Sequence, residues 1–285
     1  MLHKLIKGIA PIAALALGAA VSGCDMDISI NGEEGVPLAE LDTSGDAPTK
    51  LVLAGPDEVV VSEGSTLDIA VEGDSKAADL VRFTLKDGTL GVMREKGKWG
   101  DVGTATVRVT MPAPESITIA GSGKVTAAAM EGDTDITIAG SGSLDVADVR
   151  AGKASVTLAG SGTMSAGGRA DSLDLTVAGS GKADMQGLKV DSADINIAGS
   201  GDAAFASDGK VDANIMGSGT VRVTGRATCE VKSMGSGKVI CEAASEPAEA
   251  EATEDVAKAE PKAKKKAASK KRVAKKASPK KPRKA

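Results

Sequence analysis

The polypeptide has 285 residues, 41% of them hydrophobic and 26% charged, and a formal net charge of −4 at pH 7. It contains no tyrosine, one tryptophan, two phenylalanines and one histidine. So few aromatic side chains argue against a sugar cleft built on aromatic platforms. The one histidine is His3, which we expect to be removed on processing, and its loss excludes imidazole catalysis and histidine-ligated metal sites from the mature chain.

Residues 1–24 have the pattern of a bacterial lipoprotein signal peptide. Lys4 and Lys7 give a positive start, and "GIAPIAALALGAAV" gives an apolar core too short to span a membrane. The small residues of "VSGC" resemble a lipobox, which predicts that Cys24 is lipidated and held in a bilayer by its acyl chains. An ordinary signal peptide that is cleaved beside a coincidental cysteine is the alternative.

The next two segments precede the most regular part of the chain. We predict a tether over residues 25–48 and an N-terminal β region over residues 49–115. In the β region, "VVVSEGSTLDIAVEGD", "FTLKDGTLGV" and "VRVTMPAPESITIAGSGKV" combine β-branched residues with turn signals. We expect this region to cap the repeat that follows.

Residues 116–242 repeat one motif seven times, from "ITIAGSGKV" to "VKSMGSGKV". Apolar residues precede each GSG triplet and alternate with a polar one, which indicates a strand with one buried face. Glycine at fixed places disfavours a helix and suits sharp bends with positive φ. The first glycines of the triplets follow one another at intervals of 18 to 20 residues and are Gly121, Gly140, Gly160, Gly179, Gly199, Gly217 and Gly235.

This period is too short for a propeller blade and predicts one coil of a parallel β-solenoid, with coils stacked at about 4.8 Å. The GSG ladder, together with the order of strands and turns before it, resembles the autotransporter adhesin head (GIN domain) family over residues 49 to about 242. The resemblance implies an all-β solenoid of about seven coils and a role at the cell surface or envelope. It brings no catalytic residue and no cofactor.

Two cysteines lie at inward positions of the last repeat. Cys229 is six residues before Gly235 and Cys241 is six residues after it. We predict a disulfide between them in an oxidising compartment, where it would close a loop of about 13 residues and stabilise the fold by roughly 3 kcal/mol. Two buried free thiols are the alternative. A metal site is not expected from two cysteines without histidine.

An acidic column is the other chemical feature of the repeat. Such a column could bind Ca²⁺ or a polycation, or could be a solvated outer face that prevents association between sheets. Carboxylates in a β-helix could also serve a carbohydrate-active enzyme, although no acid/base pair stands out. We predict that the protein is not an enzyme and that it binds no metal or cofactor. Calcium binding and a carbohydrate-active β-helix enzyme are the alternatives. The position five residues before each glycine holds Ser116, Asp135, Ser155, Asp174, Asp194, Asp212 and Glu230, and the last four of these form the column of like charge.

Residues 243–285 are predicted to be a disordered tail, acidic at first and then basic. Residues 261–285 have 13 Lys and Arg and no acid, whereas residues 25–260 have 20 basic and 39 acidic residues. The basic block predicts salt-sensitive binding to anionic lipid headgroups, lipopolysaccharide phosphates, acidic wall polymers or extracellular DNA, but not to chromosomal DNA. A solubilising tail that folds back on the acidic body is the alternative. The expected contacts are Lys264, Lys265, Lys266, Lys270, Lys271, Arg272, Lys275, Lys276, Lys280, Lys281, Arg283 and Lys284.

The sequence therefore predicts a non-catalytic lipoprotein of the bacterial cell envelope. Its solenoid would be an adhesin-like or scaffolding surface, and its tail would bind an anionic envelope polymer or lipid. The anchor would hold it on the periplasmic side of the inner or outer membrane, or on the cell surface. The sequence leaves the oligomeric state and the choice of membrane open.

Overall fold

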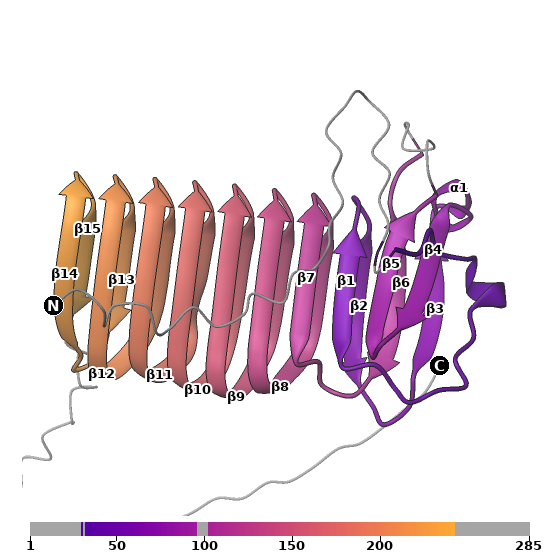
Figure 1. Cartoon of the computed structure of the whole chain (residues 1–285), viewed down its shortest axis with the longest axis horizontal. Coiled ribbons are helices and arrows are strands. Elements are labelled where there is room, and N and C mark those ends of the chain that lie inside the picture. The colour runs from indigo at the N-terminus through magenta and orange to yellow at the C-terminus, as the bar shows by residue number, and fades with distance from the viewer. Residues whose placement is uncertain (1–29, 31, 96–101, 243–285) are drawn as a thin grey trace, which may run out of the picture. The chain divides into compact units, whose positions relative to one another are not determined.

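A computed structural model describes residues 30, 32–95 and 102–242 of the chain. Within these residues, fifteen strands form one continuous sheet that winds into a parallel β-solenoid (Figure 1). The prediction of an all-β parallel solenoid is confirmed. None of the described helices is long and apolar enough to cross a membrane.

The helical elements are short and lie outside the repeat: η1 (Leu38–Glu40) and α1 (Ser75–Ala78). The strands are β1 (Lys50–Ala54), β2 (Glu58–Glu63), β3 (Asp68–Gly73), β4 (Val81–Lys86), β5 (Thr89–Arg94), β6 (Ala105–Met111), β7 (Ser116–Gly121), β8 (Lys124–Gly140), β9 (Ser143–Gly160), β10 (Thr163–Gly179), β11 (Lys182–Gly199), β12 (Asp202–Gly217), β13 (Thr220–Thr224), β14 (Thr228–Gly235) and β15 (Lys238–Glu242).

Strands β8 to β12 are 16 to 18 residues long, and each makes one full coil. Each strand begins just after one GSG bend and ends at the next, so the arrowheads in Figure 1 line up along one edge of the rod. Equivalent glycines pair in register through the whole ladder, from Gly121 with Gly140 to Gly217 with Gly235. Identical side chains therefore lie over one another.

The core consists of aliphatic files inside the coils. Through the coil that ends at Gly217, the side chains four and two residues before each glycine are at most 2% exposed. Full burial of one such side chain contributes about 1.5–3 kcal/mol, so the files are the main source of stability. Their members are Ile117, Ile119, Ile136, Ile138, Val156, Leu158, Leu175, Val177, Ile195, Ile197, Ala213 and Ile215.

The GSG bend requires glycine for two reasons. The first glycine of each triplet has a φ between +113° and +132°, a region that L side chains rarely adopt. A Cβ at Gly140 would also lie 2.5 Å from the carbonyl oxygen of Gly121 in the preceding coil. That carbonyl accepts a hydrogen bond of 2.9 Å from the amide of Ser141, and the same bond recurs at each later bend. The bend is thus part of the hydrogen-bonded ladder.

The solenoid begins earlier than the repeat does. Leu51 of β1 pairs with Ile117, and Val59 of β2 pairs with Val125, both in parallel register. Between β1 and β2, "AGPD" replaces AGSG, and Gly55 has a φ of +141°. The stretch that we expected to act only as a cap therefore includes a further coil of the same path. Asp57 stands where the second glycine would be, which hides this coil from a search for GSG.

Two further layers close the N-terminal end. Strands β5 and β6 pair in parallel with β1 and β2 and extend the stack by one layer. Strands β3 and β4 then pair antiparallel with β6 and β5. Antiparallel strands break the coil path, so the stack ends there, and Val36 adds a bridge to Phe83 of β4. The N-terminal edge of the solenoid is covered in this way.

A buried ion pair joins these layers. Asp57 is 1% exposed and Arg94 is 3% exposed. The Arg94 Nε donates to Asp57 Oδ2 over 2.8 Å, and the amide of Ala105 donates to Asp57 Oδ1 over 2.8 Å. Arg94 also donates to the carbonyl of Gly103. Both charges are satisfied by partners from different layers, which compensates their desolvation and fixes the stacking of β5 and β6 on the first coil.

Replacing Gly140 by alanine tests the requirement for glycine at the bend. We expect Gly140→Ala to lower the free energy of unfolding by roughly 2–4 kcal/mol, because Cβ meets both an unfavourable φ and a neighbouring carbonyl. Thermal or urea unfolding followed by circular dichroism measures this loss. Gly45→Ala is the matched control, since a Cβ there has no neighbour within 4 Å. Equal stability of the two variants would contradict the stacked bend.

Candidate functional site

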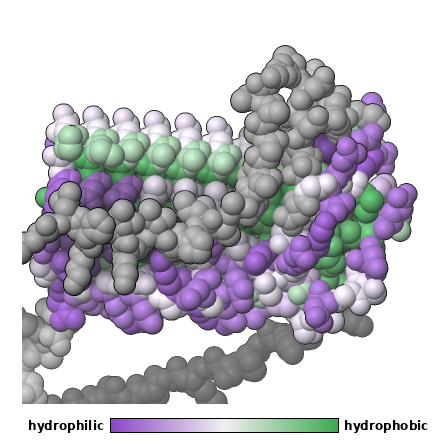
Figure 2. Space-filling model, in the orientation of Figure 1, coloured by the Kyte–Doolittle hydropathy of each residue, from purple (hydrophilic) through white to green (hydrophobic). Residues whose placement is uncertain are grey.

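The strand segments that lead into the GSG bends form one side of the solenoid. The outer surface of this side carries two columns of residues that are almost without charge. We call it the threonine–alanine face. Equivalent positions pair in register, so each column is continuous along the rod. One column is Thr118, Thr137, Thr157, Thr176, Asn196, Asn214 and Lys232, and the other is Ala120, Ala139, Ala159, Ala178, Ala198, Met216 and Met234. Figure 2 shows the second column as a pale-green row beside the white row of the bends.

The threonine–alanine face is hollowed toward the C-terminal end of the rod. A shallow groove of about 500 Å³ crosses four coils there, from Thr176 to Met234. Met216 and Met234 are 58% and 75% exposed, and the Asn214 amide donates to Asn196 Oδ1 over 3.3 Å. The groove thus offers an apolar row next to a row of hydroxyl and amide groups. Such a surface suits an extended partner with both methyl and polar groups.

At the N-terminal end of the solenoid, a side chain of the chain itself covers part of the alanine column. Ile30 is 3% exposed and packs against Val52, Ala54, Met93 and Ala120 on the outer face. An aliphatic side chain is therefore accommodated on the apolar row. From Ala159 onward, the members of the row are exposed.

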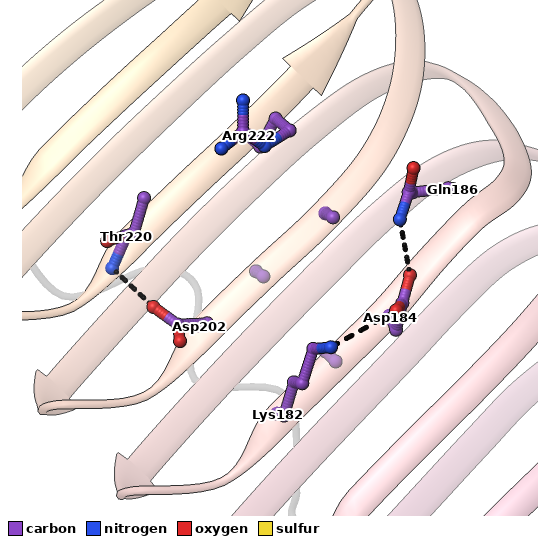
Figure 3. Close-up of a pocket in the computed structure, with 9 residues that line it drawn as sticks. Lys182, Asp184, Gln186, Asp202, Thr220 and Arg222 are labelled. Carbon is purple, nitrogen blue, oxygen red and sulfur yellow. Dashed lines mark hydrogen bonds and ion pairs between the residues drawn. The ribbon is translucent and has the colours of Figure 1, made fainter.

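The strand segments that follow the bends form another side of the solenoid. This side has a smaller, polar depression of about 290 Å³ (Figure 3). Asp184 accepts a hydrogen bond from Gln186 over 2.9 Å and lies 3.3 Å from the Lys182 ammonium. These donors lower the pKa of Asp184, the hydrogen bond from Gln186 most of all. A general acid at neutral pH needs a raised pKa, so this carboxylate is poorly suited to that task. Asp202 accepts from the amide of Thr220 instead.

Lysines interrupt the acidic column. The Lys153 ammonium lies 3.7 Å from Asp174, and the Lys210 ammonium lies 3.2 Å from Asp212 and 3.5 Å from Glu230. These pairs are exposed and contribute little stability, but they reduce the local negative charge. Within the described ranges, no three His, Cys, Asp or Glu side chains form a group that could hold a metal ion. Three carboxylates of the column, those of Asp174, Asp212 and Glu230, are thus in surface ion pairs with lysines.

A disulfide closes the last coil. It joins Cys229 of β14 to Cys241 of β15, whose Cα atoms are 6.8 Å apart. Cys229 pairs in register with Val211, and Cys241 pairs with Val223, so both cysteines continue inward files. The bond ties together the two strands that have a neighbouring coil on one side only.

The other sites expected from the sequence cannot be placed. Cys24 and the basic residues from Lys264 to Lys284 lie outside the described residues, so lipidation and polyanion binding stay predictions. The threonine–alanine face, by contrast, was not singled out from the sequence, although its columns are visible in the alignment of the seven repeats. The signal was the residue directly before each GSG, which is alanine in the first five repeats and methionine in the last two.

A family model described as "Putative auto-transporter adhesin, head GIN domain" matches residues 47–227. The chain belongs to this family. The resemblance inferred from the GSG ladder is thereby confirmed. The family description indicates a location in the cell envelope or at the cell surface, and it names an adhesin, not an enzyme.

Solved structures show the same GIN-domain fold. A "putative adhesin" from Bacteroides fragilis is 20% identical, with 70% of this chain and 92% of that chain covered and a TM-score of 0.61. A "putative lipid binding protein" from Parabacteroides distasonis is 21% identical over 69% and 93%, with a TM-score of 0.53. A "putative adhesin" from Parabacteroides merdae is 21% identical over 69% and 92%, with a TM-score of 0.56. No curated protein matches the chain.

Proposed function

We propose that this GIN-domain protein is a non-catalytic envelope lipoprotein whose solenoid adheres to an extended envelope polymer along the threonine–alanine face. The observation that carries the proposal is the continuity of that face. A column of exposed alanine and methionine runs beside a column of threonine and asparagine over consecutive coils. A polymer with a repeated methyl and amide pattern, such as the N-acetylated sugars of the cell wall, presents matching groups along its length.

The two ends of the chain would hold the rod in place. In this proposal the acyl chains on Cys24 attach the protein to a bilayer, and the basic block of residues 261–285 binds an anionic polymer or lipid. The charge distribution supports the second contact, since 13 cations follow a body that is rich in acids. Binding of this kind weakens steeply with salt, whereas the apolar contact of the face does not.

Sedimentation with cell-wall sacculi separates these two contacts. We expect Ala178→Glu with Ala198→Glu to reduce retention at both low and high salt, roughly tenfold, because the two carboxylates must be desolvated against the polymer. Deletion of residues 261–285 should reduce retention at low salt only. The assay uses the chain with Cys24→Ser, so that lipid does not contribute.

The matched control places the same two charges on the other sheet. Ser143 and Thr163 are neighbours in register and point outward, so Ser143→Glu with Thr163→Glu should leave retention unchanged. Equal losses for the two double variants would refute the adhesive face. Retention that is independent of residues 261–285 at low salt would refute the contact by the tail.

The anchor has a separate test. We expect the wild-type chain to sediment with membranes and to enter the detergent phase on Triton X-114 partitioning, and Cys24→Ser to stay in the aqueous phase. The acyl chains supply about 0.8 kcal/mol per buried CH₂. A Cys24→Ser chain that still partitions with detergent would exclude the lipid anchor.

A further inference from the structure

The two ends of the solenoid differ in whether another described strand pairs with the outermost strand edge. At the N-terminal end, β3 and β4 cover the last parallel layer in antiparallel pairing. At the C-terminal end, β14 pairs with β12 and β15 pairs with β13, and within residues 102–242 no strand covers their other edges. Val231 and Met234 are 47% and 75% exposed there. An exposed edge with apolar side chains is a template for another strand.

The direction of the backbone groups shows which residues offer hydrogen bonds at this edge. The amide of Asp135 donates to Glu115 of the preceding coil over 2.9 Å. Glu230 is the equivalent of Asp135 in the last coil, because both belong to the same in-register column. Adjacent residues of a strand direct their backbone groups to opposite sides. Val231 therefore directs its N–H and C=O toward the open end.

We propose that the occupant of this edge is a second copy of the chain. The two solenoids meet end to end through their last coils, with β14 antiparallel to β14 about a two-fold axis at Val231. In this register, Val231 faces Val231 of the second copy and exchanges both backbone hydrogen bonds with it. Glu230 then faces Lys232 of the second copy, and Lys232 faces its Glu230. The interface is isologous, as a two-fold axis requires, and its opposite charges are complementary.

Charge selects this register over its neighbours. A two-fold axis at Glu230 would place Glu230 against itself, and an axis at Lys232 would place Lys232 against itself. Like charges directly opposite each other destabilise an antiparallel pair. Lys232 makes no ion pair among the described residues, and Glu230 reaches only Lys210 of its own copy, at 3.5 Å. Both side chains are exposed and can contact the second copy.

Strand β15 repeats the pattern on the other side of the end. Lys238 and Glu242 stand at its two ends with apolar Val239 and Ile240 between them. Antiparallel to itself, β15 would bring Lys238 of one copy toward Glu242 of the other. The disulfide between Cys229 and Cys241 joins β14 to β15 and so presents both edges together. The interface shares Lys232 with the C-terminal end of the threonine–alanine face, but it does not depend on the proposed adhesive function.

Charge swaps on the full chain with Cys24→Ser test this dimer of the C-terminal coils. Sedimentation velocity over a concentration series should show a monomer–dimer equilibrium. Lys232→Glu should weaken it roughly tenfold or more, because a carboxylate then opposes the Glu230 carboxylate at each of the two symmetric contacts. Glu230→Lys should weaken it similarly, by opposing ammonium groups. The double variant Glu230→Lys with Lys232→Glu restores opposite charges across the axis and should return the affinity to near the wild-type value.

Lys50→Glu is the matched control, since Lys50 is an exposed lysine of β1, toward the other end of the rod. It should leave the dimer unchanged. A monomer at every concentration would overturn the proposal, and that is also the result expected if the chain covers the edge with its own residues 243–285. A dimer that is insensitive to Lys232→Glu, or one that the double variant fails to restore, would overturn it as well.

Discussion

The structure depends on a close contact between backbones at the GSG bend. The carbonyl oxygen of each first glycine lies against the first glycine of the next coil and accepts a hydrogen bond from the serine that follows it. Only glycine tolerates both the positive φ and the approach. Because the contact recurs at every coil, it fixes the register of the whole stack, and the register in turn places the aliphatic files inside.

Because of the same register, equivalent outward residues of successive coils stack into continuous columns. A single alanine on one coil would be an ordinary exposed residue, but seven stacked small or apolar residues form a row along the rod. The acidic positions would be multiplied in the same way, and lysines such as Lys153 and Lys210 limit the repulsion that results. The surface chemistry of a solenoid is therefore decided column by column. Two columns almost without charge run along one side of the solenoid, and ion pairs lie beside them.

Much of this architecture could be predicted from the sequence, because a repeat of fixed period leaves few packings. The period, the bends and the buried positions all followed from alternation and from glycine spacing. The first coil did not, since Asp57 replaces the second glycine and forms its ion pair with Arg94, 37 residues later in the chain. A contact over that distance leaves no periodic signal. The packing of Ile30 on the outer face was hidden for the same reason.

Amide hydrogen exchange at the bends tests the central claim most directly. The amides of Ser141, Ser161, Ser180 and Ser200 each donate to a glycine carbonyl of the preceding coil over 2.9 Å. If the bends hold the register, these amides should be protected as strongly as those of the buried strand residues beside them. Exchange of the serine amides at the rate of an unstructured peptide, while the strands stay protected, would show that the bends are ordinary loops and would contradict the account.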